Sequence, residues 1–161
     1  SVLAELRAIG IVYARITDNG VSSLGVLTQL QELDLRVRDV TDGGIKALQG
    51  LAQLRTLELA RARISDSGMP FVSRLTELRS LSLRSTGVTD AGLASLASLH
   101  RLRALNLWWT RVTDDVVPSL AAFPRLSSLV LGGTRVSDDG MSALARYSGI
   151  AHLDLHGTVL T

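Results

Sequence analysis

The chain of 161 residues has no cysteine and few aromatic residues: two tryptophans, two tyrosines and two phenylalanines. The lack of cysteine excludes disulfides and thiolate metal sites, but it leaves the redox compartment open, because cysteine-free proteins occur in both kinds. No run of about 18 apolar residues is present, so the sequence offers no membrane-spanning helix. The first residues, SVLAELRAIG, lack the basic and apolar regions of a secretory signal. The localisation stays open, with the cytoplasm slightly favoured.

Lysine is also nearly absent, since Lys46 is the only one and arginine supplies the rest of the 17 basic residues. This preference for arginine often accompanies GC-rich bacterial coding. The 15 acidic residues are interleaved with the basic ones, and the net charge is only +2. With 46% hydrophobic residues, the chain has enough apolar material for the core of one globular domain.

An apolar pattern, L-x-x-L-x-L, recurs every 24 residues along the chain. It begins at positions 6, 30, 54, 78, 102, 126 and 150, with no insertion or deletion. Six repeats are therefore complete and a seventh is started, and each reads approximately LxxLxLxxTxVTDxGLxxLxxLxx. Such a period is the signature of one supersecondary unit that stacks on its own copies. Positions within the repeat are numbered from 1 at the first leucine.

Each repeat predicts a short strand followed by a short helix. In the repeat that begins at Leu78, alternation places Leu81 and Leu83 on one face of a strand. Thr89 and Asp90 then offer a helix N-cap and an acid in the first helical turn. Because every return to the next strand runs through a helix, neighbouring strands must be parallel and about 4.8 Å apart.

The repeat resembles the leucine-rich repeat over essentially the whole chain, most closely the short TDxGL variants of F-box proteins and of GALA-type bacterial effectors. The resemblance implies an α/β fold: a right-handed solenoid, or horseshoe arc, with a parallel concave sheet of about seven strands and short helices on the convex side. We expect a single domain over residues 1–161. Neither end of the stack shows a polar cap: the first turn carries Val2, Leu3 and Leu6, and the last strand ends at GTVLT. Uncapped ends predict a fragment of a longer protein or self-association through the ends.

Three positions of the repeat carry further predictions. The threonine hydroxyl at position 9 can form a hydrogen bond with the loop backbone, which predicts a ladder of such threonines in the C-terminal half. Near the N-terminus, where position 9 is alanine or arginine, we expect the same backbone groups to be less completely hydrogen-bonded. Glycine at position 15 predicts a close approach of another group or a permissive backbone. Pro70 and Pro118 predict that the helices of their repeats start late or have an irregular first turn.

The resemblance implies a non-enzymatic scaffold that binds a protein partner on its concave face and adjoining loops. Positions 3, 5 and 7 point away from the core and are free to form a site. Trp108 at position 7 should stand on the concave face between Arg84 and Gly132, close to Asn106, while Trp109 should point into the rim. An aromatic beside a glycine notch predicts a hot spot, in which a partner residue enters the Gly132 notch. The alternative is packing alone, with Trp108 stacked on Arg84.

Two further groups of polar residues complete the predicted partner-binding site. The N-terminal strands offer a surface of mixed charge made by Glu32, Asp34, Arg36 and Glu58, and Arg61 is also predicted to bind the partner. The last strand places three polar residues on one face, and these are His152, Asp154 and His156. His-x-His on a strand can present imidazoles to zinc, but the adjacent strand offers no fourth ligand, so no metal is predicted.

Two rows of arginine line the edges of the predicted sheet. Position 2 carries Arg7, Arg55, Arg79 and Arg103, and position 10 carries Arg15, Arg63, Arg111 and Arg135. The aspartates of position 13 are expected to neutralise the second row. These rows make a nucleic-acid or other polyanion binder the alternative function, which is disfavoured by the low net charge and by the lack of interleaved aromatics. No cysteine nucleophile, glycine-rich phosphate loop or HExxH motif is present, so neither catalysis nor a cofactor is predicted.

Overall fold

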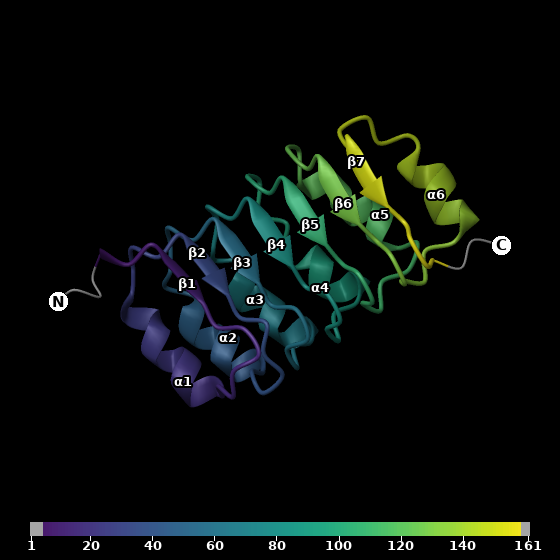
Figure 1. Cartoon of the computed structure of the whole chain (residues 1–161). Helices are drawn as coiled ribbons and strands as arrows, with labels where there is room; N and C mark the ends of the chain where they lie inside the picture. The colour runs from purple at the N-terminus through teal and green to yellow at the C-terminus, as the bar shows by residue number, and fades with distance from the viewer. Residues whose placement is uncertain (1–4, 159–161) are drawn as a thin grey trace.

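The structure, a computed structural model, describes residues 5–158 and contains one parallel sheet of seven strands in chain order (Figure 1). Each strand lies beside the same positions of the next repeat, so that Ala8 pairs with Glu32 and Glu32 with Thr56. The predicted period, register and parallel pairing are therefore confirmed. The strands are β1 (Ala8–Gly10), β2 (Glu32–Asp34), β3 (Thr56–Glu58), β4 (Ser80–Ser82), β5 (Ala104–Asn106), β6 (Ser128–Val130) and β7 (His152–Asp154).

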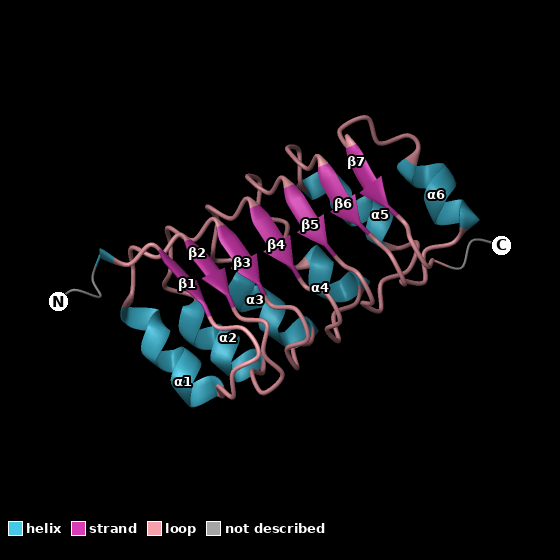
Figure 2. Cartoon of the chain, in the orientation of Figure 1, coloured by secondary structure: helices cyan, strands magenta, loops and turns pink. Residues whose placement is uncertain are grey.

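Short helical segments cover one face of the sheet and leave the other face uncovered (Figure 2). They are α1 (Asp18–Ser22), η2 (Ser23–Val26), α2 (Asp42–Leu48), η3 (Asp66–Gly68), α3 (Met69–Val72), α4 (Asp90–Ala94), α5 (Val116–Ser119), η4 (Leu120–Ala122) and α6 (Asp138–Leu144). The two proline repeats depart from the others as predicted. A 3-10 turn precedes α3, and α5 begins two residues later in its repeat than α4 does.

The repeated leucines form one continuous core between the sheet and the helices. Leu81 and Leu83, at positions 4 and 6, are 1% and 0% exposed, and Leu105 and Leu107 match them in the next repeat. Phe123 fills the core where most repeats carry leucine. Val2, Leu3 and residues 159–161, on which the prediction of uncapped ends mainly rests, lie outside the described residues.

A ladder of threonine hydroxyls stabilises the turns that follow the strands in the C-terminal half. The hydroxyl of Thr86 donates to the carbonyl of Leu83 at 2.6 Å, and Thr110, Thr134 and Thr158 make the same bond three residues back. Three of these threonines are buried, so the bond satisfies a carbonyl that is shielded from water. The predicted ladder is confirmed.

A second ladder joins consecutive repeats through the aspartate at position 13. The carboxylate of Asp66 accepts from the backbone N–H of Thr89 at 2.8 Å and from its hydroxyl at 2.7 Å. The same hydroxyl accepts from the N–H of Ala91, so it also caps α4. The pairs in this ladder are Asp18–Thr41, Asp42–Ser65, Asp66–Thr89, Asp90–Thr113 and Asp114–Ser137.

The prediction that these aspartates neutralise the arginines of position 10 is wrong. Within residues 5–158 the ion pairs are Arg36–Asp34 and Arg101–Glu77, and neither involves position 10 or position 13. The carboxylates turn instead to the next helix start, because N–H and hydroxyl donors are already oriented there and an arginine side chain would have to be ordered first.

Glycine at position 15 makes room for this ladder, which confirms the predicted close approach. A Cβ on Gly92 would lie 2.2 Å from the Asp66 carboxylate, and one on Gly140 would lie 2.1 Å from that of Asp114. Val116 replaces this glycine in the fifth repeat. There, the bonds from Thr113 to Asp90 measure 3.0 to 3.2 Å, longer than in the other pairs.

Truncating a repeated leucine should destabilise the whole solenoid. Leu81→Ala or Leu105→Ala should lower the free energy of unfolding by about 2–5 kcal/mol, because each leaves a cavity in a packed core. Val26→Ala is the control, since Val26 is 78% exposed, and its effect should stay within about 0.5 kcal/mol. Chemical denaturation measures all three. A Leu81→Ala protein as stable as the parent would contradict the observed packing.

The aspartate ladder should make stability fall in acid. Hydrogen bonds from Ser137 lower the pKa of Asp114; for Asp18, burial acts in the opposite direction, but the bonds from Thr41 and Gly44 outweigh it and lower the pKa. A carboxyl with a depressed folded-state pKa contributes stability that is complete above its unfolded value of about 3.9 and is lost as pH falls through the folded value.

We therefore expect the melting temperature to decline as pH falls below about 4. Asp114→Asn should be less stable than the parent at neutral pH and should show a shallower decline in acid. Asp115→Asn removes the same charge from an exposed neighbour and should retain the parental decline. Equal acid profiles for the two variants would argue against a stabilising role for the ladder.

Candidate functional site

The uncovered face of the sheet and the rim beside it carry the candidate site. The rim is defined here as positions 8 to 10 of each repeat, which follow the strand and are residues 13–15, 37–39, 61–63, 85–87, 109–111 and 133–135. Three areas hold most of the predicted residues: the surroundings of Trp108, an acidic recess on strands β1 to β3, and a basic recess on the rim.

Trp108 lies half-buried on the uncovered face and stacks on Arg84 of the preceding repeat. The guanidinium Cζ of Arg84 is 4.7 Å from the centroid of the indole ring, a distance typical of a cation–π contact. The backbone N–H of Trp108 donates to the side-chain oxygen of Asn106 at 2.9 Å. The structure thus brings together the three residues that the sequence predicts at the centre of the site.

The predicted notch at Gly132 is wrong, because the recess is closed. Gly132 is buried, and a Cβ placed on it would lie 3.6 Å from the Trp108 ring and 2.6 Å from the carbonyl oxygen of His156. The missing side chain lets the indole and the next repeat approach closely and leaves no gap. A partner would therefore meet the Trp108–Arg84 stack and not a cavity beside it.

Trp109 stands at the rim as predicted and is 66% exposed. Its ring lies over Gly133, where a Cβ would come within 2.5 Å of the indole. Its backbone has a φ of +56°, in the left-handed region that favours glycine. The side chain is thus held in an unfavourable backbone conformation with little burial to compensate.

Position 8 has a left-handed backbone in most repeats, and sequence reasoning missed this pattern. Thr110 N–H donates to the carbonyl of Leu107 at 3.1 Å, which closes a four-residue turn with position 8 third. A positive φ at the third residue is typical of a type II turn, which prefers glycine there. The residues with positive φ are Tyr13, Arg61, Ser85, Trp109, Gly133 and Gly157.

Tyr13 is the functional candidate that this pattern adds, because it is 80% exposed at the rim. The signal was present in the sequence, since Tyr13 lies 96 residues, or four repeats, before Trp109. Together they place two exposed aromatics on the edge that carries the position 10 arginines. The prediction that aromatics are missing from that edge is therefore wrong.

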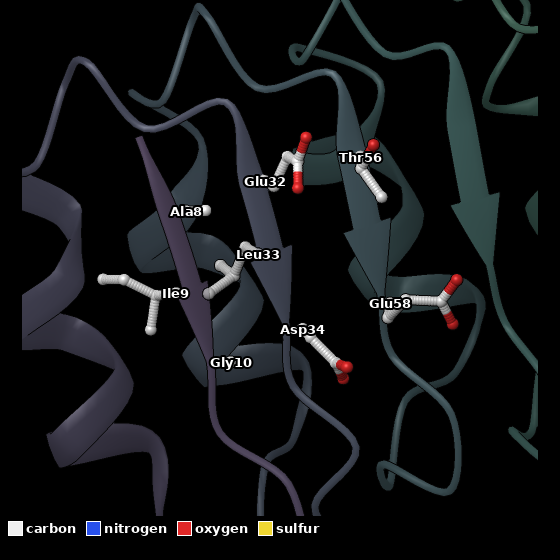
Figure 3. A pocket seen from close by; sticks show the side chains of 8 residues that line it. All are labelled: Ala8, Ile9, Gly10, Glu32, Leu33, Asp34, Thr56 and Glu58. Carbon is white, nitrogen blue, oxygen red and sulfur yellow. The ribbon is translucent and has the colours of Figure 1, made fainter. Parts of the chain in front are cut away.

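Three carboxylates lie on the N-terminal part of the uncovered face. A recess of about 330 Å³ is lined by strands β1, β2 and β3, and Glu32, Asp34 and Glu58 carry its charge (Figure 3). Burial raises the pKa of Glu58. Asp34 is neutralised by Arg36, whose Nε and Nη2 both donate to its carboxylate. This recess, here called the acidic recess, contains Asp34 and Glu58 of the predicted surface of mixed charge.

A basic recess of about 490 Å³ lies on the rim and is lined by Arg38, Arg61, Arg63 and Ser85. Arg61 was predicted to bind a partner, whereas Arg38 and Ser85 were not included in the predicted site. A smaller recess beside it is lined by Tyr13, Arg36, Ala60, Arg61 and Arg84. Arg61 therefore connects the basic recess with the surroundings of Trp108.

The predicted group of His152, Asp154 and His156 lines neither the acidic nor the basic recess, although the backbone carbonyl of His156 lies close to Gly132. His152 and His156 are exposed, and the carboxylate of Asp154 accepts from the backbone N–H of His156 at 2.9 Å. In residues 5–158, no group of three or more histidine and acidic side chains is arranged to hold a metal ion. The described helices also include none that is long and apolar enough to cross a membrane.

Comparisons with known proteins identify the class of this fold. A family model described as a leucine-rich repeat matches residues 75–97 and 125–145. The chain is also similar to the crystal structure of internalin C2 from Listeria monocytogenes, with 30% sequence identity and a TM-score of 0.70. That similarity covers 88% of this chain and 56% of the internalin chain, so this chain spans about half the length of that protein. No curated protein matches the sequence.

These likenesses support a leucine-rich repeat protein. Its parallel sheet, its 24-residue register and its repeated leucines agree with this assignment. Proteins of this family are typically binding scaffolds without catalytic activity, which supports a protein-interaction module. The closer likeness to the F-box and GALA-type variants stays a prediction.

The left-handed backbone of Trp109 predicts an unusual order of stability among variants. Trp109→Gly should be more stable than Trp109→Ala by about 1 kcal/mol, because alanine retains the cost of a left-handed backbone and glycine does not. The control is the same pair at Trp108, which has no positive φ. There alanine should be the more stable variant. Equal stability of the two Trp109 variants would show that this turn is not strained.

Proposed function

We propose that this protein is a non-enzymatic interaction scaffold that binds a protein partner on the uncovered face of its sheet, around Trp108. The observation that carries the proposal is the partly exposed Trp108–Arg84 stack, with Asn106 beside it. Tryptophan and arginine are enriched among the residues that contribute most to protein interfaces. A rigid aromatic on a sheet loses little conformational entropy when it is covered by a partner.

Arg84 has unused hydrogen-bonding capacity in this arrangement. Its Nε is buried and has no hydrogen-bond partner within the described part of the chain. A buried donor without a partner is costly, and the stack on Trp108 holds the guanidinium in place despite that cost. The stack therefore offers a partner one apolar surface and one cation fixed in place, which favours an aromatic or apolar residue next to an acceptor.

Binding of nucleic acid is the alternative, and one observation supports it. The rim combines arginines with two exposed aromatics, Tyr13 and Trp109, and bases stack on such rings. Against it stand the net charge of +2 and the acidic recess, which adjoins the rim on the same strands. A phosphate backbone that ran along both surfaces would be attracted by one and repelled by the other.

Substitutions in the stack should remove a partner without unfolding the protein. Immobilised parent, Trp108→Ala and Arg84→Gln proteins are compared by quantitative mass spectrometry after incubation with an extract of the source organism. Arg74→Gln, an exposed charge on the helix-covered side, is the control. We expect at least one protein whose recovery falls by about tenfold with both stack variants and is unchanged with the control.

The fold of each variant is checked first by thermal melting. Loss of the Trp108–Arg84 contact should cost stability by only about 1 kcal/mol, because the pair is partly exposed. If every protein captured by the parent is also captured by both stack variants, Trp108 has a packing role only. If capture is lost on nuclease treatment or at moderate salt, the nucleic-acid alternative replaces the proposal.

A further inference from the structure

We infer that the basic recess on the rim receives the carboxylates of an acidic segment of the protein partner. This inference rests on the proposed function, because it names the chemistry of the partner, but it concerns the rim and not the surroundings of Trp108. Three arginines from the second and third repeats and Ser85 from the fourth line this recess. The arginine fork matches a carboxylate through two parallel hydrogen bonds.

The backbone around the recess is fixed by bonds between repeats. The N–H of Arg61 donates to the carbonyl of Arg84 at 2.8 Å, and that of Arg63 donates to the carbonyl of Val40 at 2.8 Å. Ser85 is held in the same way by the carbonyl of Trp108 at 2.7 Å. A ligand would therefore have to order side chains but not the loop, which lowers the entropic cost of binding.

The charge of the recess is not cancelled within residues 5–158. Arg38, Arg61 and Arg63 form no ion pair with a described residue, because the two ion pairs there are made by Arg36 and Arg101. The aspartates of position 13 do not pair with these arginines, because their carboxylates are engaged in the ladder between repeats. The recess thus presents three available guanidinium groups to solvent.

The second repeat contributes to the recess through an altered turn. Position 8 is Val37 there, and a β-branched residue disfavours the left-handed backbone that the other repeats use. The N–H of Val37 bonds to the carbonyl of Leu35, and its side chain is only 2% exposed. Arg38 follows at the rim, is exposed, and lines the recess with Arg61.

Strain at two lining residues indicates that their side chains serve the surface. Arg61 and Ser85 have φ values of +68° and +56°, where glycine would be unstrained. Both are exposed, so burial does not compensate. Strained positions of this kind concentrate at ligand sites, where the surrounding structure holds them in place.

An acidic protein segment fits this surface better than a nucleic acid does. The carboxylates of the acidic recess, Glu32, Asp34 and Glu58, come from the second and third repeats, which also supply the three arginines of the basic recess. A protein can place acidic side chains on one and basic side chains on the other, and so match both potentials. A nucleic acid carries one sign of charge and would match only the first.

The test uses fluorescein-labelled hexaglutamate as the probe, with fluorescence anisotropy as the readout at about 50 mM salt, where screening is weak. The recess variant is Arg38→Gln/Arg61→Gly/Arg63→Gln; glycine suits the left-handed turn at position 61. The matched control is Arg55→Gln/Arg79→Gln/Arg103→Gln, which removes the same charge from exposed residues at the opposite edge of the sheet. The single variant Arg61→Gly replaces the triple if thermal melting shows that the triple is unfolded.

We expect the parent to bind hexaglutamate, the recess variant to bind at least about tenfold more weakly and the control to stay within about twofold. The inference is overturned if the parent does not bind the peptide, or if both triple variants lose affinity equally, which would show a net-charge effect. It is also overturned if a single-stranded thymidine dodecamer binds more tightly than the peptide and depends on the same arginines.

The variant Trp108→Ala separates this inference from the proposed function. It should bind hexaglutamate like the parent, since Trp108 does not line the basic recess. Normal partner capture by Trp108→Ala, together with loss of peptide binding by the recess variant, would refute the role of the uncovered face and leave the recess supported. The reverse pattern would support the uncovered face and refute the recess.

Discussion

The hydrogen bonds from each helix start to the aspartate of the preceding repeat hold this solenoid in register. One threonine or serine hydroxyl makes two of the bonds at each junction: it donates to the aspartate behind it and accepts from the N–H two residues ahead. Helix capping and stacking of repeats therefore depend on the same side chain. A helix of five residues such as α4 is too short to be stable alone, so its first turn depends on this capping and on packing.

That ladder also accounts for which residues are available to a partner. Because the aspartates of position 13 turn toward the next helix, they leave the arginines of the rim without intramolecular partners among the described residues. The requirement for glycine at position 15 follows from the same bond, as does its lengthening beside Val116. A stabilising interaction inside the fold and a charged surface outside it thus have one structural origin.

The turn after each strand has a comparable double effect. Its third residue is left-handed in most repeats, which holds Tyr13, Arg61 and Trp109 outward at the rim. The stack of Trp108 on Arg84 lies one residue earlier, on the uncovered face. The rim and the uncovered face are therefore adjacent parts of one surface, and the two proposals describe contacts that a single partner could make together.

The fold was predictable from the sequence because a 24-residue period without insertions leaves few alternatives. Leucines at positions 4 and 6 define the buried face, and proline indicates the irregular helices. Threonine at position 9 predicts the hydrogen bond from its hydroxyl to the loop backbone. The place of Arg84, Asn106 and Trp108 on neighbouring strands followed from the same register. Each of these properties depends on spacing along the chain, and spacing is read directly from the sequence.

The finer features were decided only by the tertiary structure. Gly132 reads as a gap in the sequence, but whether a gap is open depends on where the neighbouring indole and the His156 carbonyl come to lie. The Asp66 carboxylate could pair with an arginine or accept hydrogen bonds from the start of the next helix. The distances between these groups in the folded protein decide for Thr89. The sequence alone determined which residues share a face, since strand periodicity is local. Side-chain packing between repeats determined which of these residues touch, because contact depends on backbone turns and on rotamers that no linear pattern encodes.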